Sequence, residues 1–96
     1  MNFAWEILEK DIFYEKNINF LKKLAMNGSV DAARRVGTYY YDGAGVKKDY
    51  SVAIKWYEMA ALLGDQWSKN RLGEMYKDGK GTTPNMEKAI KWLIES

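Results

Sequence analysis

One segment of the chain is present in two copies. Residues 31–60 align with residues 67–96 without a gap, at an offset of 36 residues, and ten positions are identical. The identical pairs are Arg35/Arg71, Gly37/Gly73, Tyr40/Tyr76, Asp42/Asp78, Gly43/Gly79, Gly45/Gly81, Ala53/Ala89, Ile54/Ile90, Lys55/Lys91 and Trp56/Trp92. Unrelated segments share far fewer residues, so the two segments are copies of one unit. A repeat period of about 20 to 50 residues is typical of solenoids, in which each unit buries its apolar face on its neighbour.

Within each copy, apolar residues recur at helical spacing on both sides of a glycine-bearing loop. The segment before the first copy aligns with the second half of a repeat, so it is interpreted as part of a degenerate unit. The predicted helices cover residues 3–14, 18–27, 30–42, 50–63, 66–78 and 85–95.

These helices predict one all-α domain, an α/α solenoid of three antiparallel helix pairs with no strand. We expect a degenerate pair at residues 1–28 and full repeats at residues 29–64 and 65–96. Each full repeat has a glycine inside its first helix, Gly37 and Gly73, although a mid-helix glycine costs about 1 kcal/mol relative to alanine. We therefore expect a neighbouring helix to approach both glycines too closely for a side chain.

Composition excludes several classes of function. The chain has no cysteine and no histidine, so disulfides, thiolate metal sites and histidine chemistry are absent. Its net charge is +2 without a long basic block, which argues against nucleic-acid binding. No apolar run is long enough to span a membrane, and no basic start followed by an apolar run marks a signal peptide, so a cytoplasmic location is expected.

Catalytic motifs are also weak. The segments Gly43-Ala44-Gly45 and Gly79-Lys80-Gly81 join two helices, whereas a phosphate-binding loop joins a strand to a helix. Glu74 and Asp78 lie four residues apart, but Glu74 also lies three residues from Lys77, which is the spacing of an ordinary surface ion pair. We expect no enzyme activity, no metal site and no cofactor.

The repeated pattern of glycine pairs, tyrosine, Ala-Ile-Lys-Trp and a polar helix start resembles the Sel-one-like repeat (SLR), a relative of the tetratricopeptide repeat. The resemblance covers residues 29–96 and half a unit before them. It departs from the pattern at Lys69, Thr82 and Leu93. The resemblance implies a right-handed superhelix without catalytic activity that binds another protein, often on the concave face formed by the first helix of each pair.

Transferring that face onto this chain gives a candidate partner-binding surface. Its residues are Asp31, Arg34, Thr38, Tyr41, Trp67, Asn70, Glu74 and Lys77. Trp67 does not recur, because Asp31 stands at the same position of the first copy. Two readings of Trp67 remain open: an exposed interface anchor, or a ring packed under the helix at residues 50–63. Trp56 and Trp92 recur and are expected in the core.

The last helix suggests a second surface. Ile90, Leu93 and Ile94 are expected to be exposed there, which would favour a homodimer through this helix. The main hypothesis is a module that binds one partner protein. A narrower hypothesis is a small immunity protein that neutralises a toxin, and a third is a self-assembling structural unit.

Overall fold

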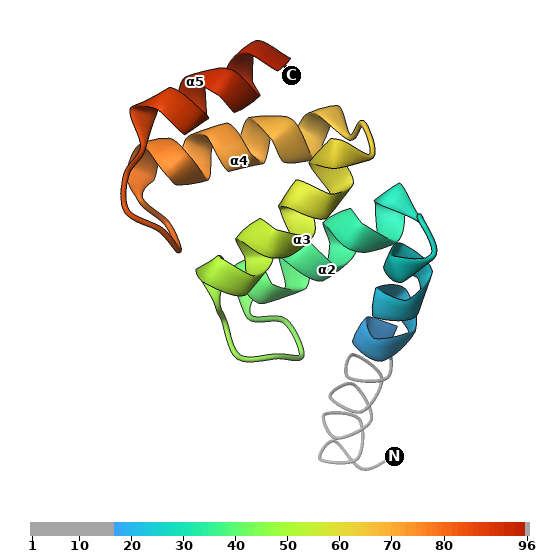
Figure 1. Ribbon diagram of the computed structural model, residues 1–96. Coiled ribbons are helices and arrows are strands. Elements are labelled where there is room, and N and C mark those ends of the chain that lie inside the picture. Colours follow the sequence, from blue (N-terminus) through green and yellow to red (C-terminus); the bar gives the residue numbers. More distant parts are fainter. Residues whose placement is uncertain (1–16, 96) are drawn as a thin grey trace.

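The computed structural model describes residues 17–95, and the helix predicted at residues 3–14 lies outside them. Residues 17–26 are helical and precede four further helices (Figure 1). These helices are α2 (Val30–Asp42), α3 (Tyr50–Leu62), α4 (Gln66–Asp78) and α5 (Met86–Glu95). No strand occurs within residues 17–95. The all-α helical repeat predicted from the sequence is therefore confirmed.

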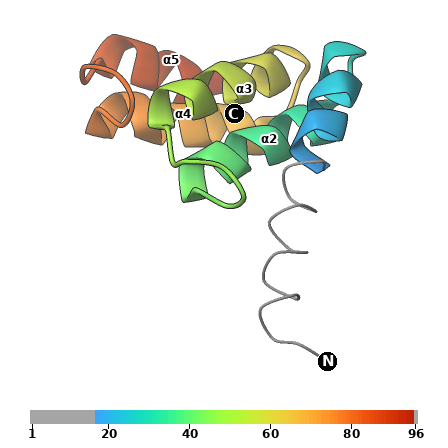
Figure 2. The ribbon, with the colours of Figure 1, turned by 90° about the horizontal axis from the view of Figure 1, so that it is seen from below.

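The helices form two packed pairs. Helix α2 packs on α3, α4 packs on α5, and α3 joins the two pairs by packing on α4. Seen from below, α2 and α4 share one layer while α3 and α5 share the other (Figure 2). Each repeat thus contributes its first helix to one layer and its second helix to the other.

Polar side chains define where the helices begin. Ser29 accepts a hydrogen bond from the amide of Ala32 at the start of α2, and Asp49 accepts from the amides of Ser51 and Val52 at the start of α3. These interactions satisfy amide donors that have no partner inside the helix. At the other end of α2, Gly43 adopts the left-handed conformation, with φ of 74°.

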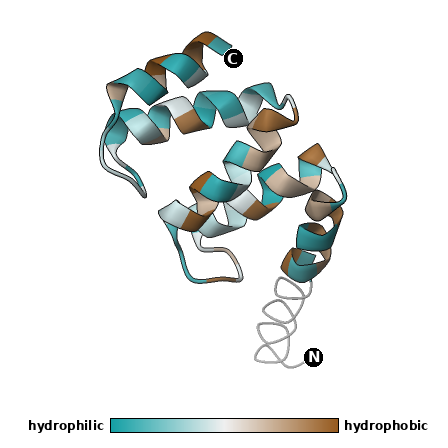
Figure 3. Cartoon of the chain, viewed as in Figure 1, coloured by the Kyte–Doolittle hydropathy of each residue, from teal (hydrophilic) through white to brown (hydrophobic). Residues whose placement is uncertain are grey.

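The core consists of two clusters, each built from more than one unit. One cluster joins α3, α4 and α5 through residues including Tyr57, Leu72 and Met75, all 0% exposed. The other joins residues 17–26 to α2 and to Ala60 of α3. Hydrophobic and hydrophilic positions alternate along each helix (Figure 3), as expected for helices with one buried side. Stability therefore depends on contacts between neighbouring units.

The recurring tryptophans lie at the edges of these clusters. Trp56 and Trp92 are half-buried and pack against the two clusters rather than at their centres. Among the helices of residues 17–95, none combines the length and the apolar character needed to cross a lipid bilayer.

Candidate functional site

The eight predicted contact residues lie on the two first helices of the repeats. Asp31, Arg34, Thr38 and Tyr41 belong to α2, and Trp67, Asn70, Glu74 and Lys77 belong to α4. We call the surface they share the α2–α4 face. Contacts between α2 and α4 hold its two halves together.

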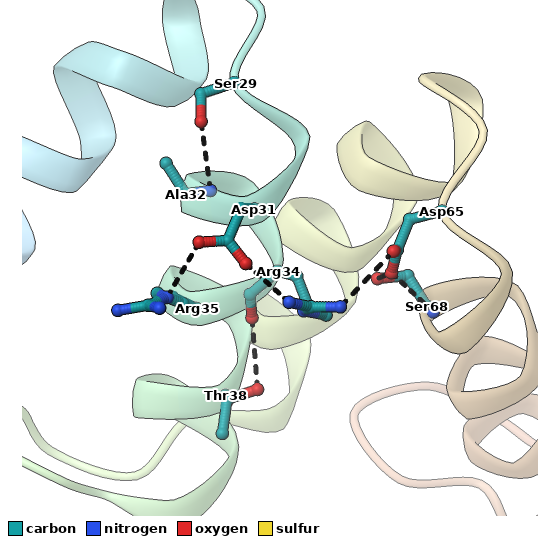
Figure 4. A network of polar contacts seen from close by, with 8 residues as sticks. All are labelled: Ser29, Asp31, Ala32, Arg34, Arg35, Thr38, Asp65 and Ser68. Atoms are coloured by element: carbon teal, nitrogen blue, oxygen red, sulfur yellow. Dashed lines mark hydrogen bonds and ion pairs between the residues drawn. The ribbon is translucent and has the colours of Figure 1, made fainter.

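One end of the face is a network of charged side chains (Figure 4). Arg34 forms an ion pair with Asp31 in its own helix, and its Nη1 lies 3.5 Å from Oδ1 of Asp65. Asp65 precedes α4 and also accepts hydrogen bonds from the amide and the hydroxyl of Ser68. Arg34 therefore ties α2 to the start of α4, and its charge is matched by carboxylates.

Thr38, at the middle of the face, supports a buried ring. Its Oγ1 donates a hydrogen bond to the backbone oxygen of Arg34 and lies 2.9 Å from the hydroxyl of Tyr57. Since Thr38 has one hydroxyl hydrogen, Tyr57 donates to Thr38. Burial raises the pKa of Tyr57 above its ordinary value, so this phenol stays neutral and keeps its hydrogen.

A second set of contacts on the face is an aromatic–cation cluster, which we define as Tyr41, Tyr50, Trp67, Arg71 and Lys80. The guanidinium carbon of Arg71 lies 4.5 Å from the centre of the Tyr41 ring and 4.9 Å from the Trp67 ring. The rings of Tyr41 and Tyr50 are 5.0 Å apart. Arg71 therefore connects the predicted residues Tyr41 and Trp67.

Arg71 was absent from the residues predicted for the face. One signal in the sequence could have found it: Arg71 follows Trp67 by four residues, the spacing that places two side chains side by side on a helix. The sequence could not reveal the contact with Tyr41, because that contact depends on how the two repeats pack.

Lys80 reaches the cluster from the loop of the second repeat. Its ammonium donates a hydrogen bond of 2.9 Å to the hydroxyl of Tyr41, and this bond raises the pKa of Lys80. The neighbouring Gly81 packs against the backbone of Tyr50 and Ser51, where an added Cβ would lie 2.5 Å from a backbone carbon. This contact fixes the loop on the first turn of α3.

Trp67 is partly packed on α3 and partly exposed, so each of its two predicted roles, packed ring and exposed interface anchor, is met in part. Its ring meets the ring of Tyr57 edge-on, with centres 5.6 Å apart, so it packs on α3. It nevertheless remains 42% exposed. Trp67, Asn70, Arg71 and Glu74 line a small hollow of about 130 Å³.

Two predicted residues contribute little to the cluster. Glu74 Oε2 lies 3.9 Å from Nη1 of Arg71, at the limit of an ion pair, and both Glu74 and Lys77 are exposed. No group of acidic residues within residues 17–95 is arranged to hold a metal ion. The face thus offers aromatic surface and fixed cations.

Comparison with known proteins places the chain among repeat proteins. Residues 30–65 and 68–96 match the Sel1 repeat. Human protein sel-1 homolog 2 is 38% identical over 55 residues, which are 57% of this chain and 8% of that protein.

Solved structures agree with this match. Cysteine rich protein B from Helicobacter pylori superposes with a TM-score of 0.80 at 32% identity, covering 85% of this chain and 62% of that one. A Sel1 repeat protein from Oxalobacter formigenes gives a TM-score of 0.76 at 28% identity, covering 81% and 60%. A protective antigen of uropathogenic Escherichia coli with an SLR fold gives 0.76 at 32%, covering 80% and 16%. The chain spans less than two thirds of the length of each of these proteins.

Proposed function

The chain belongs to the Sel1 repeat family, and we propose that it is a non-enzymatic module that binds a partner protein on the α2–α4 face, as the concave side of its solenoid. Proteins of this family generally act as protein–protein interaction modules.

The observation that carries this proposal is that Trp67 is partly exposed and yet held in place by its neighbours. A tryptophan that is 42% exposed keeps a large apolar surface in water, which is costly unless a partner covers it. The ring is nevertheless held by Tyr57 on one side and by Arg71 on another. A side chain fixed before binding loses less entropy when a partner covers it, and Trp, Tyr and Arg are the residues most enriched at binding hot spots.

Affinity capture with matched variants tests the proposal. The immobilised protein is incubated with an extract of its source organism, and retained proteins are compared among wild type, a Tyr41→Ala/Trp67→Ala variant and a Lys55→Ala control. Lys55 is an exposed residue of α3, outside the α2–α4 face. A protein retained by wild type and by the control but lost by the double variant, at unchanged helicity by circular dichroism, supports the proposal. Equal retention by all three would refute it.

A second candidate function, self-association, is favoured by α5. Ile54 and Ile90 occupy the same repeat position, yet Ile54 is 7% exposed because α4 covers it, whereas Ile90 is 52% exposed. Met86 and Ile94, at 59% and 76% exposure, extend this stripe along α5. A second copy is the proposed occupant, because two antiparallel α5 helices would place Glu87 of each beside Lys91 of the other. Sedimentation velocity over a range of concentrations tests it, and a monomer at all of them, unchanged by Ile90→Asp, would contradict it.

A further inference from the structure

Four of the five residues of the aromatic–cation cluster differ between the two repeats, and the fifth, Arg71, is shared with Arg35. At an offset of 36 residues, Tyr41 corresponds to Lys77, Trp67 to Asp31, and Lys80 to Ala44. Tyr50 likewise corresponds to Met86. Positions shared by the two copies build the helices and the loops. Four positions that are not shared, Tyr41, Tyr50, Trp67 and Lys80, meet in this cluster between the two repeats.

Arg71 shows what this difference does. Arg71 and Arg35 occupy the same repeat position, and Arg35 Nε lies 2.9 Å from Oδ2 of Asp31, four residues before it. In the second copy, Trp67 replaces that aspartate, and Arg71 lies over the tryptophan ring instead. The carboxylate of Asp31 is thus replaced by an aromatic ring. The quadrupole of the ring attracts the guanidinium, but the ring carries no net negative charge that would neutralise it.

Lys80 adds a second charge of the same kind. Its ammonium contacts the hydroxyl of Tyr41 and lies 5.4 Å from the centre of that ring, so its near neighbour is again aromatic. Asp42 and Asp78 act on Tyr50 and on Lys80 electrostatically, but both carboxylates are exposed at the ends of their helices. Water screens exposed charges strongly, so these two carboxylates act on the cluster more weakly than a direct ion pair would.

The N–H donors of the Arg71 guanidinium are the part of this side chain that can bind a further group. The guanidinium carbon lies over the rings of Tyr41 and Trp67, while a guanidinium carries its five N–H donors in its own plane. Within residues 17–95, the ion-pair partner of these donors is Glu74, at 3.9 Å, and its side chain is 55% exposed. The in-plane edge of a guanidinium matches a carboxylate, which can accept two parallel hydrogen bonds.

We propose that Arg71 and Lys80, held by the rings of Tyr41 and Trp67, bind a carboxylate side chain within an acidic segment of the partner protein. The inference rests on the proposed function, because it names the chemistry of the partner at the same face. An apolar residue beside the carboxylate covers the exposed part of Trp67. Glu74 is then an internal competitor, which the partner's carboxylate displaces from Arg71.

Fluorescence anisotropy with defined peptides tests this inference. The probe is a fluorescein-labelled peptide of about ten residues with alternating Glu and Leu, and the matched control peptide has Gln in place of each Glu. We expect wild type to bind the Glu peptide at least about tenfold more tightly than the Gln peptide at low salt. A hydrogen bond to a charged group contributes enough free energy to change a dissociation constant by about tenfold or more.

Protein variants then locate the binding site. Arg71→Gln and Lys80→Gln should each weaken binding of the Glu peptide by about tenfold. Glu74→Gln should strengthen it, because the internal competitor is gone. Lys55→Gln removes the same charge elsewhere and should leave the affinity within about twofold. Helicity measured by circular dichroism confirms that each variant is folded.

Four results would overturn the inference. These are equal affinity for the two peptides, absence of binding to either peptide, equal weakening by Lys55→Gln and Arg71→Gln, or displacement of the probe by inorganic phosphate at lower concentration than by glutamate. The last result would assign the site to a phosphate group instead. If the peptide experiment fails but the Tyr41→Ala/Trp67→Ala variant no longer captures the native partner, the proposed function still stands. If the double variant still captures that partner, the proposed function itself is refuted.

Discussion

The ring of Tyr57 packs directly against Gly37: a Cβ added at residue 37 would lie 2.8 Å from ring carbons Cδ1 and Cε1. The second repeat reproduces the relationship at the same positions, because a Cβ on Gly73 would lie 2.5 Å from Cγ of Leu93. The close helix approach expected from the sequence is thus confirmed in both copies. The two copies differ in the nearest neighbour, a rigid ring in one and a flexible aliphatic chain in the other, although a Cβ on Gly73 would also lie 3.3 Å from the backbone oxygen of Ala89.

This difference predicts that Gly37→Ala is more destabilising than Gly73→Ala. Forcing a methyl group into a packed site costs about 1–3 kcal/mol, of which the better helix propensity of alanine returns up to about 1 kcal/mol. Tyr57 is fully buried and its hydroxyl is held by Thr38, so it has little freedom to move. Leu93 is 38% exposed and can rotate toward solvent. Urea unfolding followed by circular dichroism measures both changes, and an equal loss in the two variants would contradict the prediction.

The second prediction concerns the start of α4. Asp65→Ala should lower the free energy of unfolding by about 1–2 kcal/mol, the usual loss when a helix cap is removed. It also leaves the hydroxyl of Ser68 without its partner, and Ser68 is 0% exposed. Asp65→Asn should cost less, because an asparagine still caps the helix.

Asp31→Ala is the matched control for Asp65. It removes the other carboxylate that pairs with Arg34, but this one is 55% exposed. Exposed ion pairs contribute about 0–1 kcal/mol, so a small change is expected. A loss in Asp31→Ala as large as in Asp65→Ala would show that the ion pairs, rather than the cap, stabilise this junction.

The sequence predicted the helices well because the repeat shows the same pattern of apolar residues, loop glycines and helix starts twice. The caps Ser29 and Asp49 and the turn glycines act on residues close in the chain, which is why local sequence patterns define the ends of the helices. Thr38 shows the limit of this reasoning. Its helix position was correct, but its hydroxyl pairs with Tyr57, a contact across 19 residues that no helical spacing reveals.

The candidate site was predicted less completely for the same reason. Tyr41 and Trp67 were both among the predicted contact residues, and the structure brings them together through Arg71. In the sequence, Arg71 looks like an ordinary repeat residue because Arg35 stands at the same position of the first copy. In the structure, Arg35 forms a surface ion pair with Asp31. Only the packing of one repeat on the next shows that the same residue type has a different neighbour in the second copy.

The third prediction is a dependence of stability on alkaline pH through Tyr76. Burial, together with the hydrogen bond to Glu58 and the negative charge of that residue, raises the pKa of Tyr76 from 10.0 to about 12. A phenol with a raised pKa stabilises the folded state fully below its ordinary pKa, and this contribution disappears as the pH rises through the folded-state value. The difference in unfolding free energy between wild type and Tyr76→Phe should therefore decrease between pH 10 and pH 12.

Titration of tyrosinate absorbance provides the direct measurement for Tyr76. The step near pH 12 should shrink in Tyr76→Phe, and a smaller late step should remain because burial also raises the pKa of Tyr57. Glu58→Gln removes the charge and should lower the pKa of Tyr76. An unchanged late step in both variants would show that neither Glu58 nor Tyr76 accounts for it.

The last prediction compares two glycines with the same backbone constraint. Gly64 and Gly81 both have positive φ, 102° and 80°, so alanine at either position costs about 1–2 kcal/mol for the left-handed conformation. An added Cβ on Gly64 would meet nothing within 4 Å, whereas one on Gly81 would meet the backbone of Tyr50 and Ser51. That backbone belongs to the capped first turn of α3 and cannot yield as a side chain could.

Gly81→Ala should therefore lose more stability than Gly64→Ala in urea unfolding. It should also weaken binding of the Glu peptide, because the loop that carries Lys80 is pushed away from Tyr41, while Gly64→Ala should leave peptide binding unchanged. Equal stability losses in the two variants would mean that the loop moves off α3 at little cost. In that case Lys80 would not be held in place before a carboxylate arrives, and the proposed subsite would depend on Arg71 alone.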